Sequence, residues 1–337
     1  MQKSVYKKFI FRLIIFFAVL VLIDRGLGLA FKKIYFAQRV GQFSQTTYAV
    51  DSAKQDIIIF GSSRAVRDYS SPIISNITGL SCYNSGRDGL MIPYCAAVED
   101  VTLKRCRPKL LILDIAPREL GTDKIKYERL TILLPYCQQH KELVKYISQA
   151  SRFEKYKLFS KTYPYNSSLF ILATNSLFPG SEKKDENGYL PLDGAMDKAK
   201  MDDYLERMTS RYGTIRNKRE IAEKAAVGYY RQFLDSAAAK GVKTLVIISP
   251  TLLKDPFYLD NQTIEKNIVA NVAKAYPNVT FLDFSSDPRF NYHPEKFADV
   301  FHLNKKGSEE FSVILGRYIT DRQLARANDQ LAAVKTN

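Results

Sequence analysis

The chain has 337 residues, enough for one large domain or two ordinary ones, and 46% hydrophobic with 25% charged residues is typical of a folded protein. The net charge of +15 would suit a nucleic-acid partner, but residues 1–40 alone hold eight Lys and Arg against one acidic residue. The remaining charge is spread out, and no nucleic-acid motif or compact basic stripe is present, so the composition argues against a nucleic-acid partner. It favours a basic surface that tolerates an anionic membrane or anionic glycans.

The first predicted element is an N-terminal transmembrane helix within residues 1–35. Basic residues precede an apolar run, Leu13–Ile23, which Asp24 and Arg25 interrupt before apolar character resumes. A spanning helix needs about 20 predominantly apolar residues. Counted from Phe9 to Phe31, the segment is long enough if its charged residues reach the two interfaces.

A cleaved signal peptide is the alternative, because Gly28-Leu29-Ala30 supplies small residues of the type found at cleavage sites. The continuation of apolar residues beyond Asp24 favours an anchor. Either reading exports the body of the chain. We therefore expect a single-pass cell-membrane protein with its body on the extracytoplasmic (periplasmic) side.

Strand and helix signals then alternate, which predicts an α/β domain with a mostly parallel sheet. Short apolar runs of this kind are typical of strands buried on both faces. The predicted strands are 56–60, 82–84, 110–115, 242–249 and 280–283. The predicted helices begin at Ser71-Pro72, cover 90–106, 218–240 and 263–275, and end with one capped by Asn304.

Residues 120–217 break this rhythm and are rich in Tyr, Lys and loop signals. They are interpreted as an insertion, either a lid or substrate region or a packing subdomain without a direct catalytic role. The α/β domain then comprises 36–119 and 218–322, and 323–337 form a polar C-terminal tail. The four cysteines, Cys82, Cys95, Cys106 and Cys137, are predicted to be small buried hydrophobic residues, with one oxidised pair an option outside the cytoplasm.

The first candidate site is Gly61-Ser62-Ser63, at the turn after the first predicted strand. A sharp turn there can expose a serine hydroxyl at the sheet edge, beside the backbone N–H groups of the following helix. The glycine permits the tight turn. A helix-capping serine is the alternative interpretation.

The second candidate site is Asp299 and His302, just before the last predicted helix. A serine nucleophile needs an imidazole base, and a carboxylate that orients the imidazole and stabilises its charged form. The chain has three histidines, and His140 and His293 lie in segments expected at the surface. His302 is therefore the predicted base.

Together these motifs resemble the SGNH (GDSL-like) hydrolase superfamily over about residues 55–118 and 240–320. The family's Gly-Asp-Ser nucleophile motif corresponds to Gly61-Ser62-Ser63, with Ser62 in place of Asp, and its Asp-x-x-His-Leu motif is matched from Asp299. The resemblance implies a three-layer, flavodoxin-like parallel sheet and a Ser63-His302-Asp299 triad. It also implies an oxyanion hole formed by the backbone N–H groups of Ser63 and Gly86.

The chain departs from the family after the third strand. There the family has Gly-x-Asn-Asp, whose Asn is a third oxyanion donor, whereas this chain has Ala116-Pro117-Arg118-Glu119. Asn84 and Arg118 are candidate substitutes. A Gly-Ser-Ser motif and a Pro-containing third block also occur in membrane-anchored relatives such as the D-alanyl transfer protein of teichoic-acid modification. Those relatives, like the alginate acetylation proteins, move acyl groups on cell-surface polymers.

The resemblance thus predicts a serine esterase or O-acyltransferase acting on acyl esters of a cell-surface or extracellular glycan. The alternative is a non-catalytic SGNH-like subunit of a complex with a multispanning membrane acyltransferase. A third reading, an α/β body with a capping serine and a buried histidine, needs two independent coincidences. No phosphate-binding loop, dinucleotide fingerprint or metal-ligand spacing is found in the sequence, so no cofactor and no metal is predicted.

Overall fold

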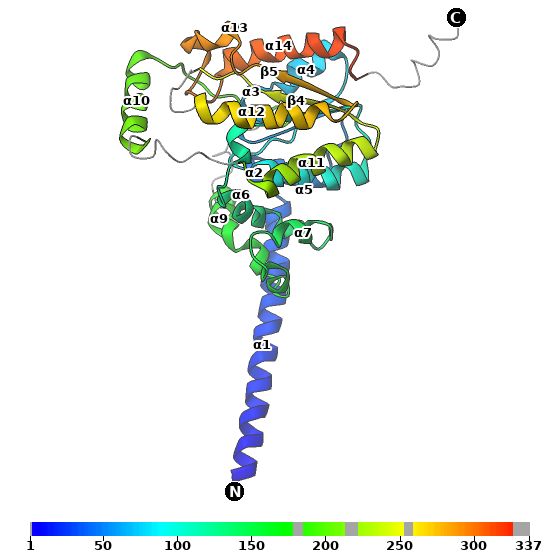
Figure 1. The fold of residues 1–337 in the computed structure, drawn as a ribbon. Coiled ribbons are helices and arrows are strands. Elements are labelled where there is room, and N and C mark those ends of the chain that lie inside the picture. The colour runs from blue at the N-terminus through cyan, green and yellow to red at the C-terminus, as the bar shows by residue number, and fades with distance from the viewer. Residues whose placement is uncertain (1, 178–184, 213–221, 253–258, 326–337) are drawn as a thin grey trace, which may run out of the picture. The chain divides into compact units, whose positions relative to one another are not determined.

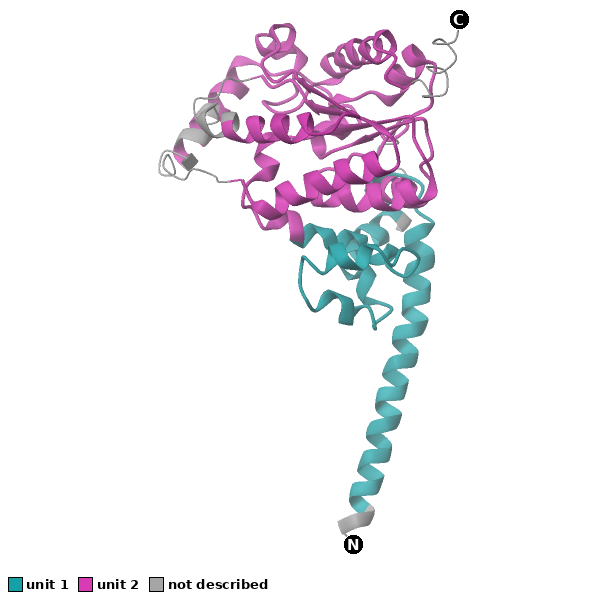
Figure 2. Ribbon diagram, turned by 45° about the vertical axis from the view of Figure 1, so that its right-hand side comes forward, with its two compact units in different colours: residues 1–44, 128–183 teal, residues 45–127, 184–337 magenta. Residues whose placement is uncertain are grey.

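The computed structural model describes residues 2–177, 185–212, 222–252 and 259–325. The chain divides into two compact units (Figure 2). Unit 1 comprises residues 1–44 and 128–183, and unit 2 comprises 45–127 and 184–337. The predicted insertion at 120–217 is thus split between the two units, and most of the predicted tail lies outside the described residues.

Unit 2 is built on a parallel five-stranded sheet with the order β2-β1-β3-β4-β5. The strands are β1 Ile57–Phe60, β2 Cys82–Asn84, β3 Leu110–Asp114, β4 Lys243–Ile248 and β5 Val279–Asp283. Every residue of the central strands β1 and β3 is buried, as expected for short apolar strands covered on both faces. All five predicted strands and the mixed α/β class are confirmed.

Helices lie on both sides of this sheet (Figure 1). Helix α4 (Ser71–Thr78) packs against α14 (Lys305–Asp321), and α5 (Ile92–Arg105) packs against α11 (Lys224–Ala239). Asn304 caps α14 as predicted, because its side chain accepts a hydrogen bond from the Gly307 N–H at 3.0 Å.

The remaining helices of unit 2 are mostly short. They are α3 Ser63–Asp68, α10 Lys198–Tyr212, α12 Leu259–Lys274, α13 Pro288–Asn291, and the 3-10 helices η1 Pro117–Leu120 and η4 Pro294–Lys296. Two further helices cross the boundary between the units in sequence, α2 Gly41–Asp51 and α6 Ile125–Glu128. The predicted start of the 218–240 helix lies outside the described residues, and α11 begins at Lys224.

The segment after residue 184 belongs to unit 2 because its backbone pairs with edge strand β2. The Asn84 N–H donates to the Asn187 carbonyl at 2.9 Å. Gly188 follows with φ +86°, and a Cβ added there would lie 1.9 Å from the Asn84 carbonyl oxygen. Only glycine therefore fits this close approach.

Unit 1 contains the long helix α1 (Gln2–Phe36) and a set of short helices. The short helices are η2 Arg129–Tyr136, α7 Leu143–Ile147, α8 Glu154–Lys157, η3 Tyr163–Ser168 and α9 Leu169–Leu177. The end of α1 packs into them, with the Tyr35 hydroxyl 3.1 Å from that of Tyr136.

The segment Val5–Phe36 of α1 is long and apolar enough to cross a membrane, as predicted, and it is the one such helix among the described residues. Its length and composition suit a membrane anchor or a signal sequence. All four cysteines are free thiols, three of them buried and Cys106 half-buried.

Candidate active site

The turn after β1 projects two serines at the carboxyl edge of the sheet. Gly61 has φ +152°, and a Cβ there would lie 2.8 Å from the Asp114 carbonyl oxygen, so glycine is required. Helix α3 begins immediately afterwards, with Ser62 at its N-cap and Ser63 as its first residue. Helix geometry leaves the N–H of Ser63 without a partner inside the helix.

The loop before α14 holds the second candidate site. Asp299 Oδ1 accepts hydrogen bonds from the backbone N–H groups of Phe301, at 2.8 Å, and His302, at 3.0 Å. The next residue, Leu303, donates its N–H to Asp68 Oδ1 of α3 at 2.9 Å. This hydrogen bond therefore joins the loop that carries His302 directly to the helix that carries Ser63.

The structure brings the three predicted side chains together. The Ser63 Oγ atom lies 2.7 Å from His302 Nε2, and His302 Nδ1 lies 2.9 Å from Asp299 Oδ2. Burial raises the pKa of Asp299, but the hydrogen bonds from the His302 ring and from the two backbone N–H groups outweigh it, so the pKa is lowered overall. Asp299 is thus held as a carboxylate beside the imidazole.

Ser62, the residue in place of the family's Asp, faces a carboxylate. Its hydroxyl donates to Glu119 Oε1 at 2.9 Å, and the Ala116 N–H approaches the same oxygen at 3.4 Å. Glu119 is buried, and burial raises its pKa to about 7. Glu119 was not predicted to be part of the site, although its place soon after β3 puts it near the sheet edge that carries Ser63.

A buried set of charged groups lies under the site and was also missed from sequence. Arg64 Nε lies 3.4 Å from Asp114 Oδ1, and the Tyr69 hydroxyl donates to Asp114 Oδ2 at 2.7 Å. Asp68 is fully buried, and burial raises its pKa well above the usual value. Asp114 is the last residue of the buried strand β3, Arg64 and Asp68 lie in α3, and Tyr69 directly follows that helix.

The predicted oxyanion donors Gly86 and Asn84 already make hydrogen bonds within the protein. The Gly86 N–H donates to Asn84 Oδ1 at 3.0 Å, and Asn84 Nδ2 donates to the carbonyls of Ala65, at 2.6 Å, and Tyr69, at 3.0 Å. Asn84 is buried on an edge strand, where its amide satisfies backbone groups that would otherwise lack partners. In this conformation neither Gly86 nor Asn84 meets the predicted oxyanion role.

Arg118, the other candidate donor, lines the cleft that contains Ser63 and His302. Its guanidinium carbon lies 5.0 Å from the centre of the Phe301 ring, which also meets Tyr204 of α10 edge-on at 6.1 Å. Phe301 and Tyr204 therefore form one wall of the cleft, with a cation at its rim.

The other two histidines also lie near carboxylates. His293 Nδ1 is 3.0 Å from Glu295 Oε1, and His140 Nδ1 is 3.9 Å from Glu142 Oε1. Neither residue is among those that line the cleft of Ser63. The pair His293–Glu295 therefore offers a matched comparison for His302–Asp299.

Comparisons with known proteins identify no family. No protein-family model matches the sequence, and no curated protein matches it. Among the solved structures that resemble it is one from Streptococcus pneumonia whose name refers to platelet activating factor. That likeness has 12% sequence identity and a TM-score of 0.41, over 90% of this chain and 99% of the other.

The arrangement has the chemical parts needed for nucleophilic catalysis. A hydroxyl lies within hydrogen-bond reach of an imidazole, and a carboxylate holds the other ring nitrogen. His302 is partly exposed to the cleft, so a bound acyl group can reach both the serine and the base. The catalytic roles of Ser63, His302 and Asp299 stay predictions.

Proposed function

We propose that this chain is a serine-dependent acyl-ester enzyme of the SGNH type, with Ser63 as nucleophile. The observation that carries the proposal is the 2.7 Å contact between Ser63 Oγ and His302 Nε2, with Asp299 on the other ring nitrogen. Nucleophile, base and orienting carboxylate in this relation form the general pattern of an activated serine.

In the proposed reaction, Ser63 Oγ attacks the acyl carbonyl carbon while His302 Nε2 takes the hydroxyl proton. Asp299 stabilises the resulting imidazolium and keeps Nδ1 protonated. The tetrahedral intermediate then expels the substrate alkoxide, which takes the proton back from Nε2 and leaves an acyl-serine. In the second half, His302 Nε2 takes the proton of water or of an acceptor hydroxyl as that oxygen attacks the acyl-serine. The bond between the acyl carbon and Ser63 Oγ then breaks, the proton returns to Ser63 Oγ, and the acyl group stays on the attacking oxygen.

The oxyanion donors proposed here are the Ser63 N–H and the Arg118 side chain. Ser63 contributes an N–H that the first turn of α3 does not use. Arg118 is a charged donor on the cleft rim, where it stands in for the family's missing Asn. Asn84 is set aside, because its amide is already bonded to backbone groups.

The proposed family placement is supported by the order of the parts along the fold. The serine follows the first strand of a parallel sheet, and the Asp-x-x-His segment precedes the last helix. Helices cover both sides of the sheet, as a three-layer, flavodoxin-like SGNH body requires. We propose O-acyl groups of a cell-surface or extracellular glycan as the substrate, and α1 as the single membrane anchor of a periplasmic body.

The test is turnover of aryl acetates, or a glycan acetylation profile, in Ser63→Ala and His302→Ala. Both substitutions should lower turnover by about 10^4-fold or more. His293→Ala is the matched control, since it removes an imidazole that also has a carboxylate partner. Unchanged acyl chemistry in Ser63→Ala would reject the proposal.

A second candidate is a non-catalytic subunit of a membrane acyltransferase complex. The engaged Gly86 N–H favours it, because an oxyanion hole short of donors would slow the chemistry. On this alternative the wild-type chain has no acyl-ester turnover and purifies with a multispanning membrane protein. Ser63→Ala would then leave glycan acylation intact.

A further inference from the structure

Unit 1 carries a surface segment, residues 152–161, that we name the aromatic–basic loop. Three of its side chains are exposed although they are aromatic: Phe153 at 52%, Tyr156 at 66% and Phe159 at 71%. Exposed aromatic residues gathered in one short segment mark an interaction surface rather than a protein core.

A cation lies over each of these rings. Arg152 is 4.8 Å from the centre of the Phe153 ring, and Lys155 is 4.9 Å from that of Tyr156. The Phe159 ring is covered at 4.9 Å by Arg25, which comes from α1. Aromatic rings paired with basic groups are suited to the membrane interface, where rings meet the acyl boundary and cations meet phosphate.

The loop is fixed to α1 at the end of the apolar run. Asp24 accepts hydrogen bonds from the hydroxyls of Ser160, at 2.6 Å, and Thr162, at 2.8 Å, and from the Lys161 N–H at 2.8 Å. Gly28, one turn further, packs against Lys161 so closely that an added Cβ would lie 2.4 Å from the Lys161 Cβ. This stretch of α1 is therefore part of the folded unit.

These contacts also bear on the fate of α1. Cleavage near Gly28-Leu29-Ala30 would remove Asp24, Arg25 and Gly28 and leave the loop without its partners. A helix that supplies contacts to the mature fold is suited to retention as an anchor rather than removal as a signal sequence.

The length of the free part of α1 sets the depth of the loop. The candidate membrane span begins at Val5, and its nineteen helical residues before Asp24 extend about 28 Å. The hydrocarbon core of a bilayer is about 30 Å thick. Because this length is close to the thickness of the core, the protein segment beside Ile23 should lie at the membrane surface.

We propose that α1 is a retained anchor and that the aromatic–basic loop lies in the headgroup region of the bilayer. Phe153, Tyr156 and Phe159 would enter the boundary with the acyl chains, and the neighbouring basic groups would meet lipid phosphates. The partner is thus the phospholipid surface itself, and the inference stands independently of the proposed catalysis.

The chain contains no tryptophan, so a single introduced tryptophan is its only indole reporter. We would reconstitute the full chain with Phe159→Trp into phosphatidylcholine–phosphatidylglycerol vesicles whose lipids carry bromine near the headgroup end of the acyl chains. The proposal predicts that the tryptophan emission shifts to the blue and loses most of its intensity to bromine quenching.

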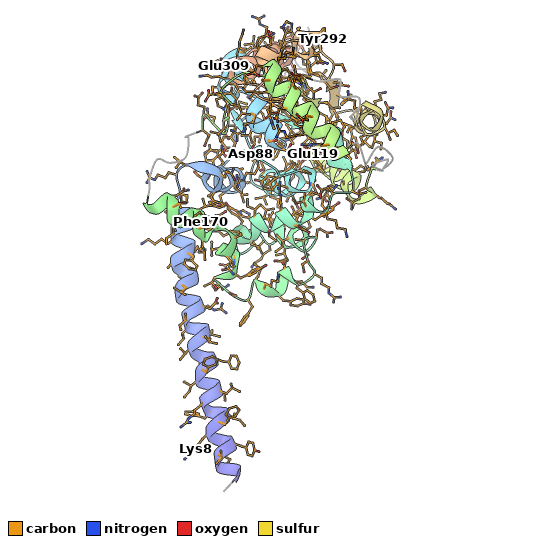
Figure 3. All side chains as sticks on the ribbon, turned by 90° about the vertical axis from the view of Figure 1, so that its left-hand side faces the viewer. Lys8, Asp88, Glu119, Phe170, Tyr292 and Glu309 are labelled. Atoms are coloured by element: carbon orange, nitrogen blue, oxygen red, sulfur yellow. The ribbon has the colours of Figure 1, made fainter. Side chains whose placement is uncertain are left out.

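Phe170→Trp is the matched control within the same unit. Phe170 is 81% exposed on α9 and lies toward the C-terminal end of α1, whereas Lys8 lies near its N-terminal end (Figure 3). Helix α9 contacts the chain at Gln38, beyond about 18 Å of helix that follows Asp24. Emission from this variant should keep its intensity in brominated vesicles.

Two results would overturn the proposal. One is a reconstituted Phe159→Trp protein that floats with the vesicles but is quenched no more than Phe170→Trp. The other is a chain whose α1 is absent from the mature protein in the cells that make it. Phe153→Trp repeats the test at a second exposed ring, so that a local effect at Phe159 cannot decide the outcome.

Discussion

Two neighbouring strands end in turns that look alike in sequence and behave differently in the structure. After β1, Gly61 leads into a turn whose Ser63 hydroxyl faces an imidazole in an open cleft. At the end of β2, the Asn84 side chain accepts a hydrogen bond from the Gly86 N–H and donates one to the backbone of α3. A polar group at the end of a strand can act on a bound substrate only if it is not already hydrogen-bonded to nearby backbone groups.

Among changes that keep both Ser63 and His302, the largest effect should come from substitution of Asp299, the carboxylate beside His302. Asp299→Asn keeps the size of the side chain but replaces the carboxylate with an uncharged amide, whose NH2 group can donate to His302 Nδ1 and favour the wrong tautomer. The kcat should therefore fall about 10^4-fold. KM should change little, since Asp299 acts through His302. Glu295→Gln, beside His293, is the control and should leave both constants unchanged.

Arg118→Ala tests which turn supplies the oxyanion donors. If the guanidinium replaces the missing Asn, kcat should fall about 10²-fold to 10³-fold while the melting temperature stays the same. Arg118→Lys should recover part of that loss, because it retains a charged donor. A wild-type kcat in Arg118→Ala would show that Arg118 is not an oxyanion donor and would favour the Gly86 N–H, in the turn after β2.

Asn84→Ala should lower stability and leave kcat nearly unchanged, which is the opposite of the result expected for Arg118→Ala. It leaves the Ala65 and Tyr69 carbonyls and the Gly86 N–H without their partner, so the free energy of unfolding should fall by about 3 kcal/mol. The kcat of the folded fraction should stay within a few-fold of wild type.

Ser85→Ala is the control for this change, measured by urea denaturation. Ser85 is buried in the same turn, and its hydroxyl has no hydrogen-bond partner within the part of the chain that the structure describes. Equal destabilisation by the two substitutions would contradict the structural role given to Asn84.

A further expected effect is on the pH dependence of stability, through Glu119. Its pKa in the folded chain is about 7, above the value of 4.5 for a free side chain, so between these values the folded state binds the extra proton. Stability therefore falls as pH rises from about 4.5 to 7, by up to about 3 kcal/mol for this group.

Glu119→Gln should remove that dependence and flatten the urea midpoint between pH 5 and pH 8 relative to wild type. Glu295→Gln, an exposed substitution, should leave the wild-type slope unchanged. The same slope in wild type and Glu119→Gln would show that the buried carboxyl titrates normally.

Much of this fold was predictable because each element leaves a local signature. Short apolar runs gave the five strands, and Asn304 marked the start of α14. The proximity of Ser63, His302 and Asp299 was predictable for a related reason: Asp299 and His302 lie in one short loop, and Ser63 closely follows the first strand.

The missed features depend on contacts between distant segments. Glu119 bonds Ser62 across 57 residues, and Leu303 bonds Asp68 across 235, so no sequence window contains either pair. The hydrogen bond from Gly86 to Asn84 was not predicted, because nothing in Asn84-Ser85-Gly86 indicates that the Asn84 side chain also bonds to the backbone of α3. The part of 120–217 that belongs to unit 2 also makes a long-range contact, because Gly188 packs against Asn84.

The central claim is that Ser63 is a nucleophile activated by His302. The most direct measurement is reaction of the folded, full-length chain with a fluorophosphonate, followed by mass spectrometry of its peptides. If His302 activates Ser63, one adduct should form, on the peptide containing Ser63, and it should be lost in His302→Ala and kept in His293→Ala. A folded chain that takes no adduct at Ser63, or takes one equally without His302, would contradict it.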